Sequence, residues 1–328
     1  MRIIFCTSPG GPENLVVAQA PTPNPGPGEV RLRVHAAGVN RADLLQRQGF
    51  YPPPPGISEV IGLEVSGIVD AVGAGVDPEL LGSERVALLA GGGYAEYVVV
   101  PAGQTLPIPA GIDLVSAAGV IEVAATVLSN FDHVSLHAGE TVLIHGGAGG
   151  IGTFAIGYAK QLKTKVIVTA GTPEKRELCL ALGADAALDY HGDPPGWIEG
   201  VMTETAGAGV DVILDIMGAK YLEANVDALA AGGRLVVIGL QGGTKGTLNL
   251  NRLLSKRGTI TATSLRFRPV AQKVAICAEV EKRVWPLYES GKLKLPPQRV
   301  FNFENVAAAH SQLASGENVG KIILQVSN

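Results

Sequence analysis

The spacing of apolar residues changes about a third of the way along the chain. Before residue 123, apolar and polar side chains alternate over 29–39, 61–73 and 95–100, and a period of two predicts β-strands. The proline-rich segment 49–56 lies between the first two of them, and a second such segment, 21–29, precedes them. They predict surface loops, because proline lacks the N–H that a central strand needs. We therefore expect a β-rich domain at the start of the chain.

From residue 123, short apolar runs alternate with segments of helical periodicity. Strand-like runs occupy 141–147, 165–171, 186–190, 210–218, 234–240 and 259–265, and helix-like runs occupy 152–162, 174–183 and 221–233. Such alternation is typical of βαβ units around a parallel sheet buried on both faces. After this region come a helical stretch over 270–291, a mixed segment over 299–316 and a final strand over 320–328.

The pattern predicts an α/β protein of two domains. A doubly wound Rossmann domain is expected over 123–265, and a β-rich domain over 1–122 and 266–328. The length of 328 residues agrees with two domains, because one hydrophobic core seldom grows beyond about 250–300 residues.

Composition removes several classes of function. The net charge of −4 gives no electrostatic footprint for nucleic acid or an anionic membrane. Three distant cysteines argue against a disulfide framework and against a four-cysteine zinc lobe. The first apolar run is too short for a signal peptide, and no uninterrupted apolar run reaches the ~18 residues of a membrane helix. We expect a cytoplasmic protein without membrane or nucleic-acid partners.

A cluster of glycines lies between the strand-like run at 141 and the following helix. It contains the spacings Gly147-x-Gly149-x-x-Gly152 and Gly146-x-x-Gly149-x-x-Gly152. Glycine allows a tight turn and close approach to a pyrophosphate, whose charge the helix N-terminus attracts. The alternative is a glycine-rich turn that binds nothing. We predict a dinucleotide site formed by Gly146, Gly147, Ala148, Gly149, Gly150, Ile151 and Gly152.

The end of the next strand indicates which dinucleotide is bound. NAD sites usually place Asp or Glu there to bind the ribose 2′-OH. This strand instead ends in Gly171 and Thr172, and Lys175 follows. A carboxylate at the strand end would repel a 2′-phosphate, whereas these small residues and a lysine would accept it. We therefore predict NADPH; the alternative is that Lys175 is only a solvated surface lysine.

Four segments carry a resemblance to a known family. Residues 36–55, 61–73, 146–152 and 320–324 resemble the zinc-independent quinone oxidoreductase (zeta-crystallin-like) family of the medium-chain dehydrogenase/reductase superfamily, and within it the inducible branch. The resemblance implies a GroES-like catalytic domain beside the Rossmann domain. It also implies a homodimer that pairs through the sheet edge formed by 232–240 and 259–265.

The same resemblance exposes departures from the zinc alcohol dehydrogenases of that superfamily. Asn40 stands where those enzymes carry a cysteine ligand, and Gly62-Leu63-Glu64 stands where they carry a histidine and a glutamate. Leucine cannot bind zinc and asparagine binds it poorly. We therefore predict no metal.

Further site residues follow from the resemblance. It implies that Asn40 contacts the acceptor or orients the nicotinamide, that Tyr51 borders the acceptor, and that Tyr190 flanks the 2′-phosphate or the adenine. It also implies cofactor contacts for Gly239, Leu240, Leu265, Arg266 and Lys321. The alternatives are an Asx turn for Asn40, loop packing for Tyr51, and surface positions for the two basic residues.

The missing metal directs the prediction of function. A developing alkoxide needs a Lewis acid or strong donors, whereas hydride transfer to a quinone gives a delocalised aromatic anion. We predict an NADPH:quinone oxidoreductase that acts in a cleft between the domains. One alternative is an NADPH-dependent enoyl or enone reductase. Another, from a different class, is a low-turnover NADPH-binding structural or RNA-associated protein.

Overall fold

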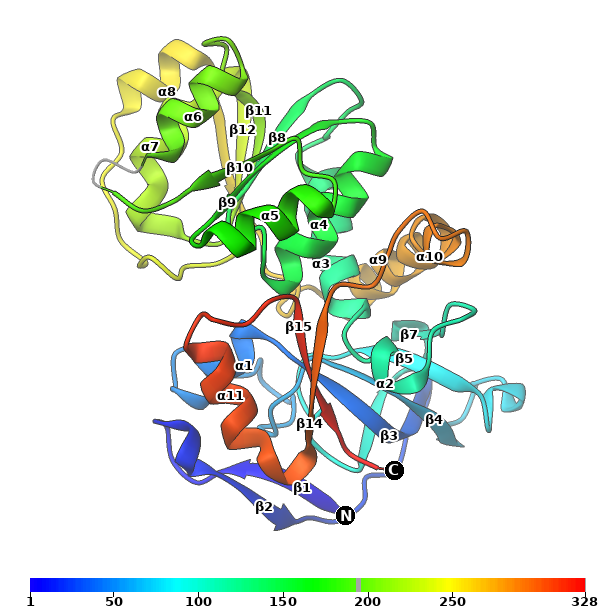
Figure 1. Ribbon diagram of the computed structural model, residues 1–328. Helices are drawn as coiled ribbons and strands as arrows, with labels where there is room; N and C mark the ends of the chain where they lie inside the picture. Colours follow the sequence, from blue (N-terminus) through cyan, green and yellow to red (C-terminus); the bar gives the residue numbers. More distant parts are fainter. Residues whose placement is uncertain (193–195, 328) are drawn as a thin grey trace. The chain divides into compact units, whose positions relative to one another are not determined.

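The chain forms two compact units in the computed structural model, which describes residues 1–192 and 196–327 (Figure 1). One unit comprises Met1–Ala125 with Leu265–Asn328, and the other comprises Thr126–Ser264. Helix α3 (Ile121–His133) crosses the division. Each unit is described by itself below.

The first unit is built on a sheet whose strands run in the order β14-β15-β3-β4-β5-β7, with β6 also paired to β3. Strand β3 follows the alternation expected from its sequence, and its inward side chains Val30, Leu32 and Val34 are almost fully buried. A separate antiparallel hairpin pairs β1 with β2. The strands are β1 (Arg2–Cys6), β2 (Leu15–Gln19), β3 (Glu29–Val39), β4 (Glu64–Val72), β5 (Glu84–Leu88), β6 (Tyr97–Pro101), β7 (Thr105–Pro107), β14 (Gln298–Asn302) and β15 (Lys321–Gln325).

Helices of the first unit are α1 (Arg41–Arg47), α2 (Leu114–Ala117), α9 (Val270–Arg283), α10 (Trp285–Glu289) and α11 (Val306–Ala314). The expected helical stretch over 270–291 is two helices, because Pro286 lies in the first turn of α10 and proline cannot continue a preceding helix. The loop at 49–56 contains neither helix nor strand, as its prolines predict.

The second unit is a six-stranded sheet in which every neighbouring pair is parallel. Its order β10-β9-β8-β11-β12-β13 is the 3-2-1-4-5-6 order of a Rossmann fold, which confirms the predicted fold class. The strands are β8 (Thr141–Ile144), β9 (Lys165–Ala170), β10 (Ala186–Asp189), β11 (Val210–Asp215), β12 (Leu229–Val237) and β13 (Thr259–Ala262). The helices are α4 (Gly150–Gln161), α5 (Pro173–Ala181), α6 (Trp197–Glu204), α7 (Leu222–Ala228) and α8 (Leu250–Lys256).

One predicted helix of this unit is shorter than its periodicity suggested. The helical interpretation of 221–233 is wrong beyond Ala228, because Leu229 already pairs with Val210 as the first residue of β12. The pairing shifts register between Val210 and Val212. A run of small residues fits either element, and here the ladder with β11 decides.

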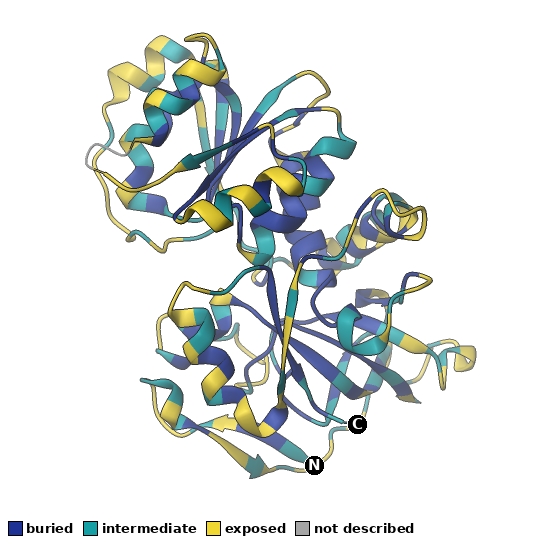
Figure 2. Cartoon of the chain, viewed as in Figure 1, coloured by how far each residue is buried: buried dark blue, intermediate teal, exposed yellow. Residues whose placement is uncertain are grey.

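The segment Leu114–His133, which contains α2 and α3, is long and apolar enough on length and composition to cross a membrane. However, 78% of its most apolar window is buried inside the protein, and α3 is mostly dark blue in Figure 2. Such burial is typical of a core helix.

Candidate functional site

A left-handed glycine opens the loop between β8 and α4. Gly146 has φ +74°, and its carbonyl accepts the N–H of Gly149 at 3.1 Å. A Cβ on Gly152 would lie 2.3 Å from that carbonyl oxygen and 2.6 Å from the Cα of Gly147. Both ends of the loop therefore require glycine, one for its dihedral angle and the other for close contact between backbones.

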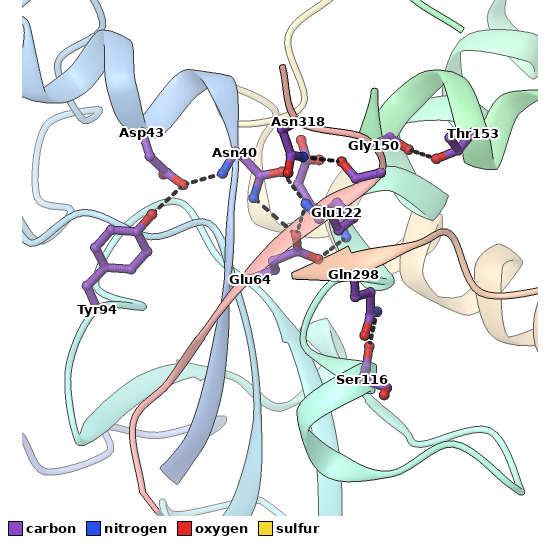
Figure 3. Close-up of polar contacts among 12 residues, drawn as sticks. Asn40, Asp43, Glu64, Tyr94, Ser116, Glu122, Gly150, Thr153, Gln298 and Asn318 are labelled. Carbon is purple, nitrogen blue, oxygen red and sulfur yellow. Dashed lines mark hydrogen bonds and ion pairs between the residues drawn. The ribbon is translucent and has the colours of Figure 1, made fainter. Parts of the chain in front are cut away.

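The tip of the loop is open. A Cβ on Gly149 would meet only one atom within 4 Å, the carbonyl oxygen of Gly146 at 3.5 Å, and Gly149 is exposed. It is the N-cap of α4, whose first N–H groups have no partner inside the helix. Thr153 fastens this first turn, because its hydroxyl donates to the carbonyl of Gly149 at 2.9 Å and to that of Gly150 at 3.1 Å, the second of which is drawn in Figure 3. An open tip and a helix N-terminus together fit a dinucleotide pyrophosphate.

The residues after β9 form a second part of this edge. Thr172 caps α5 by accepting the N–H of Lys175 at 3.3 Å. A Cβ on Gly171 would lie 2.5 Å from the hydroxyl of Tyr190, so the tyrosine ring packs directly on a bare backbone. Tyr190 keeps 41% of its surface exposed. These predicted cofactor residues lie at the carboxyl ends of neighbouring parallel strands, as the sequence implied.

Arg176 is a basic group at this edge that the sequence analysis missed. Its guanidinium contacts Asp189 Oδ2 at 3.0 Å and donates to the carbonyl of Gly171 at 3.4 Å. Asp189 also accepts the backbone N–H of His191 at 2.9 Å and pairs with its ring at 2.7 Å. The carboxylate at the end of β10 is thus already occupied by cationic and N–H groups.

The loops after β11 and β12 complete the edge. Asp215 is fully buried, and it accepts the N–H groups of Met217 at 2.7 Å and Gly218 at 2.9 Å. Burial raises the pKa of Asp215 to about 6. A Cβ on Gly239 would lie 2.9 Å from the carbonyl oxygen of Ile216, so these two loops touch through their backbones. Leu240 follows with 51% of its surface exposed.

In the first unit, Asn40 and Glu64 (Figure 3) belong to a buried cluster that also contains Lys321. The Lys321 ammonium donates to Asn40 Oδ1 and to Glu64 Oε1, both at 2.6 Å. Asn40 Nδ2 donates to Glu64 Oε1 at 3.1 Å, and the N–H of Glu122 donates to Glu64 Oε2 at 3.0 Å. The ammonium therefore fixes the orientation of the Asn40 amide, and both charges are compensated although they are buried.

This donor set does not fit a catalytic zinc ion. Leu63, at the position of a histidine ligand, presents only hydrocarbon, and the amide oxygen of Asn40 is already bonded to an ammonium. Over residues 1–192 and 196–327, no group of three His, Cys, Asp or Glu side chains is placed to hold a metal ion. Lys321 supplies the positive charge of this cluster.

A second polar chain holds Asn40 from its backbone. Asp43 accepts the N–H of Asn40 at 2.7 Å and the hydroxyl of Tyr94 at 3.0 Å. Tyr94 also contacts His310 Nε2 at 3.2 Å, and Arg47 lies 3.5 Å from the other ring nitrogen. Burial, and then the nearby Arg47, lowers the pKa of His310 to about 3. Burial raises the pKa of Asp43 to about 6.

The guanidinium of Arg266 packs against the face of the Tyr51 ring. The guanidinium carbon lies 5.1 Å from the ring centroid, and Arg266 donates to the carbonyls of Ala90 at 2.6 Å and Tyr51 at 3.0 Å and to Gln46 Oε1 at 2.7 Å. The Phe267 ring meets Tyr51 edge-on at 5.5 Å. Arg266, predicted as a cofactor residue, is 4% exposed, and half-buried Leu265 precedes it.

The structure thus gathers the predicted residues into three groups. One is the Rossmann edge, the second joins Asn40 with Lys321, and the third joins Tyr51 with Arg266. Sequence reasoning missed Glu64, Asp43 and Arg176. The spacing Asn40-x-x-Asp43 is a capping-box signal that points to Asp43, whereas nothing in the sequence joins Tyr94 to His310.

Comparison with known proteins gives consistent matches. Residues 26–110 match the family described as alcohol dehydrogenase GroES-like domain, and residues 150–277 match the family described as zinc-binding dehydrogenase. A quinone oxidoreductase of Pseudomonas aeruginosa is 33% identical over 318 residues, which cover 96% of each chain.

Two solved structures are similar over nearly the whole chain. The Escherichia coli quinone oxidoreductase complexed with NADPH is 28% identical with a TM-score of 0.87, and the match covers 99% of both chains. The CurK enoyl reductase is 25% identical with a TM-score of 0.86, also over 99% of both. The chain therefore belongs to the medium-chain dehydrogenase/reductase superfamily and, within it, to the quinone oxidoreductase-like family of oxidoreductases.

Proposed function

We propose that the protein is an NADPH-dependent quinone oxidoreductase that works without zinc. The observation that carries this proposal is the cluster in which Lys321 binds Asn40 and Glu64 beside an apolar Leu63, where metal-dependent relatives of the superfamily would place ligands. A site with an ammonium and amide donors suits an acceptor that spreads its new charge over an aromatic ring. It suits a simple carbonyl less well, because an alkoxide needs stronger stabilisation.

We assign the cofactor to the open edge of the Rossmann sheet. The N–H groups of Gly150, Ile151 and Gly152 would hold the pyrophosphate, because they begin α4 beside the open tip at Gly149. Thr172, Lys175 and Tyr190 would hold the 2′-phosphate and adenine. NADPH bound there would supply a hydride from C4 of its nicotinamide ring.

The proposed role of Asn40 is to donate a hydrogen bond to an oxygen of the acceptor. Its amide nitrogen carries two hydrogens, one of which goes to Glu64. Because Lys321 holds the amide oxygen, the second N–H has a fixed direction. Tyr51 would border the acceptor, with its ring held by Arg266. Positioning would supply most of the catalysis.

The cofactor assignment is tested by Lys175→Ala. We expect kcat/KM with NADPH to fall about tenfold relative to that with NADH, because one phosphate-binding charge is lost. The matched control is Lys165→Ala, which removes a lysine at the amino end of β9, where it pairs with Glu204 at 3.2 Å. An unchanged ratio of the two kcat/KM values in Lys175→Ala would refute the assignment.

An enoyl or enone reductase is the second candidate, and the similarity to CurK enoyl reductase favours it. Steady-state assays with NADPH should compare 1,2- and 1,4-quinones with enones and enoyl thioesters. We expect kcat/KM to be higher with the quinones. Turnover of enoyl thioesters with no quinone turnover would overturn the first proposal and establish the second.

We also propose a cytoplasmic homodimer. Strand β13 ends the sheet order of the second unit, and a bare sheet edge invites pairing with another chain. Light scattering that gives a monomer mass would contradict the dimer. The domain division into 1–122 with 266–328 and 123–265, and the assignment to the inducible branch, stay predictions.

A further inference from the structure

A chain of buried polar side chains lies directly beneath the glycine loop. His145 follows β8, Thr169 lies in β9, and Asn225 lies in α7, and all three are 1% exposed or less. Burying polar groups in the core of a parallel sheet costs free energy unless each one is hydrogen-bonded. Nothing in the chemistry proposed above uses these three residues, so their position needs another explanation.

The hydrogen bonds that join Asn225, His145 and Thr169 run in one consistent direction. His145 Nε2 lies 2.7 Å from Asn225 Oδ1, an acceptor, so with the Asn225 amide in this orientation Nε2 carries the proton. In the neutral imidazole Nδ1 is then an acceptor, and it lies 3.1 Å from the hydroxyl of Thr169. With its own proton directed at His145, Thr169 Oγ1 accepts the N–H of Gly146 at 3.2 Å.

The imidazole is held in this state by its surroundings. The rings of Trp197 and Tyr221 meet it edge-on, with centroids 4.9 Å and 5.0 Å away. Burial lowers the pKa of His145 to about 4. The ring is therefore neutral at neutral pH, and Nδ1 keeps the lone pair that the Thr169 hydroxyl needs.

Thr169 holds two successive residues of the loop. Its hydroxyl accepts the N–H of Gly146 and its carbonyl accepts the N–H of Gly147 at 2.9 Å. Gly146 is the residue with φ +74°, and its carbonyl in turn binds the N–H of Gly149 at the open tip. The hydroxyl of Thr169 thus determines the direction in which the loop leaves the sheet, and His145 determines the direction of that hydroxyl.

We infer that His145, Thr169 and Asn225 are positioning residues of the cofactor site, which fix the pyrophosphate-binding loop from beneath. The N–H groups of Gly146 and Gly147 are bound to Thr169, so those at the start of α4 are the ones presented to the phosphates. This inference rests on the proposed function. It adds that affinity for the cofactor depends on three side chains that do not touch it.

The test is Thr169→Val in the full-length protein, because valine keeps the shape and suits a strand. We expect the Kd of NADPH, measured by fluorescence titration, to rise about tenfold, since one hydrogen bond that orders the loop is lost. Thr169→Ser should bind within about twofold of wild type. The matched control is Thr164→Val, which removes a buried hydroxyl bonded to the carbonyl of Ala159 at 2.9 Å just before β9.

A merely structural role would give a different result. In that case Thr169→Val would lower the thermal midpoint as Thr164→Val does, and the Kd of NADPH would not change in either variant. Equal Kd values in Thr169→Val and Thr164→Val would overturn the inference.

A measurement without cofactor separates this inference from the proposed function. Amide hydrogen exchange at Gly146 should be slow in wild type and in Thr169→Ser and faster in Thr169→Val, and equal rates would overturn the inference.

If Thr169→Val does not fold, ¹⁵N NMR of the His145 ring in the wild-type protein provides the test. A neutral His145 protonated at Nε2 supports the chain of hydrogen bonds, and protonation at Nδ1 refutes it. A wild-type protein with slow exchange at Gly146 and His145 protonated at Nε2 that nevertheless binds no NADPH would refute only the proposed function.

Discussion

Replacing either of two glycines of the same loop with alanine is expected to affect a different property. One replacement should lower the stability of the fold, and the other should weaken cofactor binding. In Gly152→Ala, the new methyl carbon would lie 2.3 Å from the carbonyl oxygen of Gly146 and 2.7 Å from the carbonyl carbon of Gly147. Both neighbours are backbone, so the loop itself must move by about 1 Å to restore ordinary contact. Overpacking of this kind costs roughly 1–3 kcal/mol of unfolding free energy.

In Gly149→Ala, the new methyl carbon would meet only one atom, at 3.5 Å, and φ is an ordinary −79°. Alanine is a poorer N-cap than glycine by up to about 1 kcal/mol. It also restricts the unfolded chain, which contributes about 0.4–1 kcal/mol of stability in the other direction. The two effects nearly cancel, so stability should change little, but the methyl group occupies the surface where the pyrophosphate is expected.

The assay therefore pairs thermal unfolding of the apoprotein with titration by NADPH. Gly152→Ala should lower the midpoint by roughly 3–10 °C, from the entropy of unfolding of a domain of this size. Gly149→Ala should leave the midpoint within about 2 °C of wild type and raise the Kd of NADPH about tenfold. A Gly149→Ala protein that binds NADPH like wild type would refute our placement of the pyrophosphate. An unchanged midpoint in Gly152→Ala would refute the close backbone contact.

Two further predictions concern the first unit. Burial raises the pKa of Asp43 from 3.8 to about 6, so between these values the folded protein holds a proton that the unfolded chain has released. Wild type should thus lose up to about 3 kcal/mol of unfolding free energy relative to Asp43→Asn as pH rises from 4 to 7, and a difference independent of pH would contradict this. Arg266→Lys should lower the unfolding free energy by about 2–4 kcal/mol, because lysine cannot reach three divergent acceptors. The comparison is Gln46→Ala, which removes one of the three, and equal losses in denaturant unfolding would contradict the role given to Arg266.

The sequence was most informative where a residue type is tied to a local conformation. The glycine spacing predicted the loop after β8, and the absence of an acid after β9 marked Gly171 and Thr172, because both signals lie within a few residues of the feature they report. Helix limits were less predictable. The stretch after Tyr221 kept a helical period to residue 233, and only the parallel pairing of Leu229 with Val210 ends the helix earlier.

The partners of the predicted residues could not be found in this way. Lys321 reaches Asn40 across 281 positions, and Arg266 reaches the carbonyl of Ala90 across 176. No local pattern carries such contacts. The sequence predicted Asn40, Tyr51 and the glycine loop as site residues, and the structure adds what holds each of them in place.

The three predicted groups share one physical arrangement. In each, a residue proposed to meet cofactor or acceptor is fixed by a buried polar side chain that adjoins an apolar run. Glu64 begins a buried strand, His145 directly follows an apolar one, and Arg266 follows the Rossmann domain with 4% exposure. Each is kept buried only by its partners, since an unpaired polar group would cost about 1–3 kcal/mol or more. A buried polar residue at the end of an apolar run is therefore a signal in its own right. It marks a place where stability has been exchanged for a fixed geometry, and in this chain these places lie behind the residues to which we assign the chemistry.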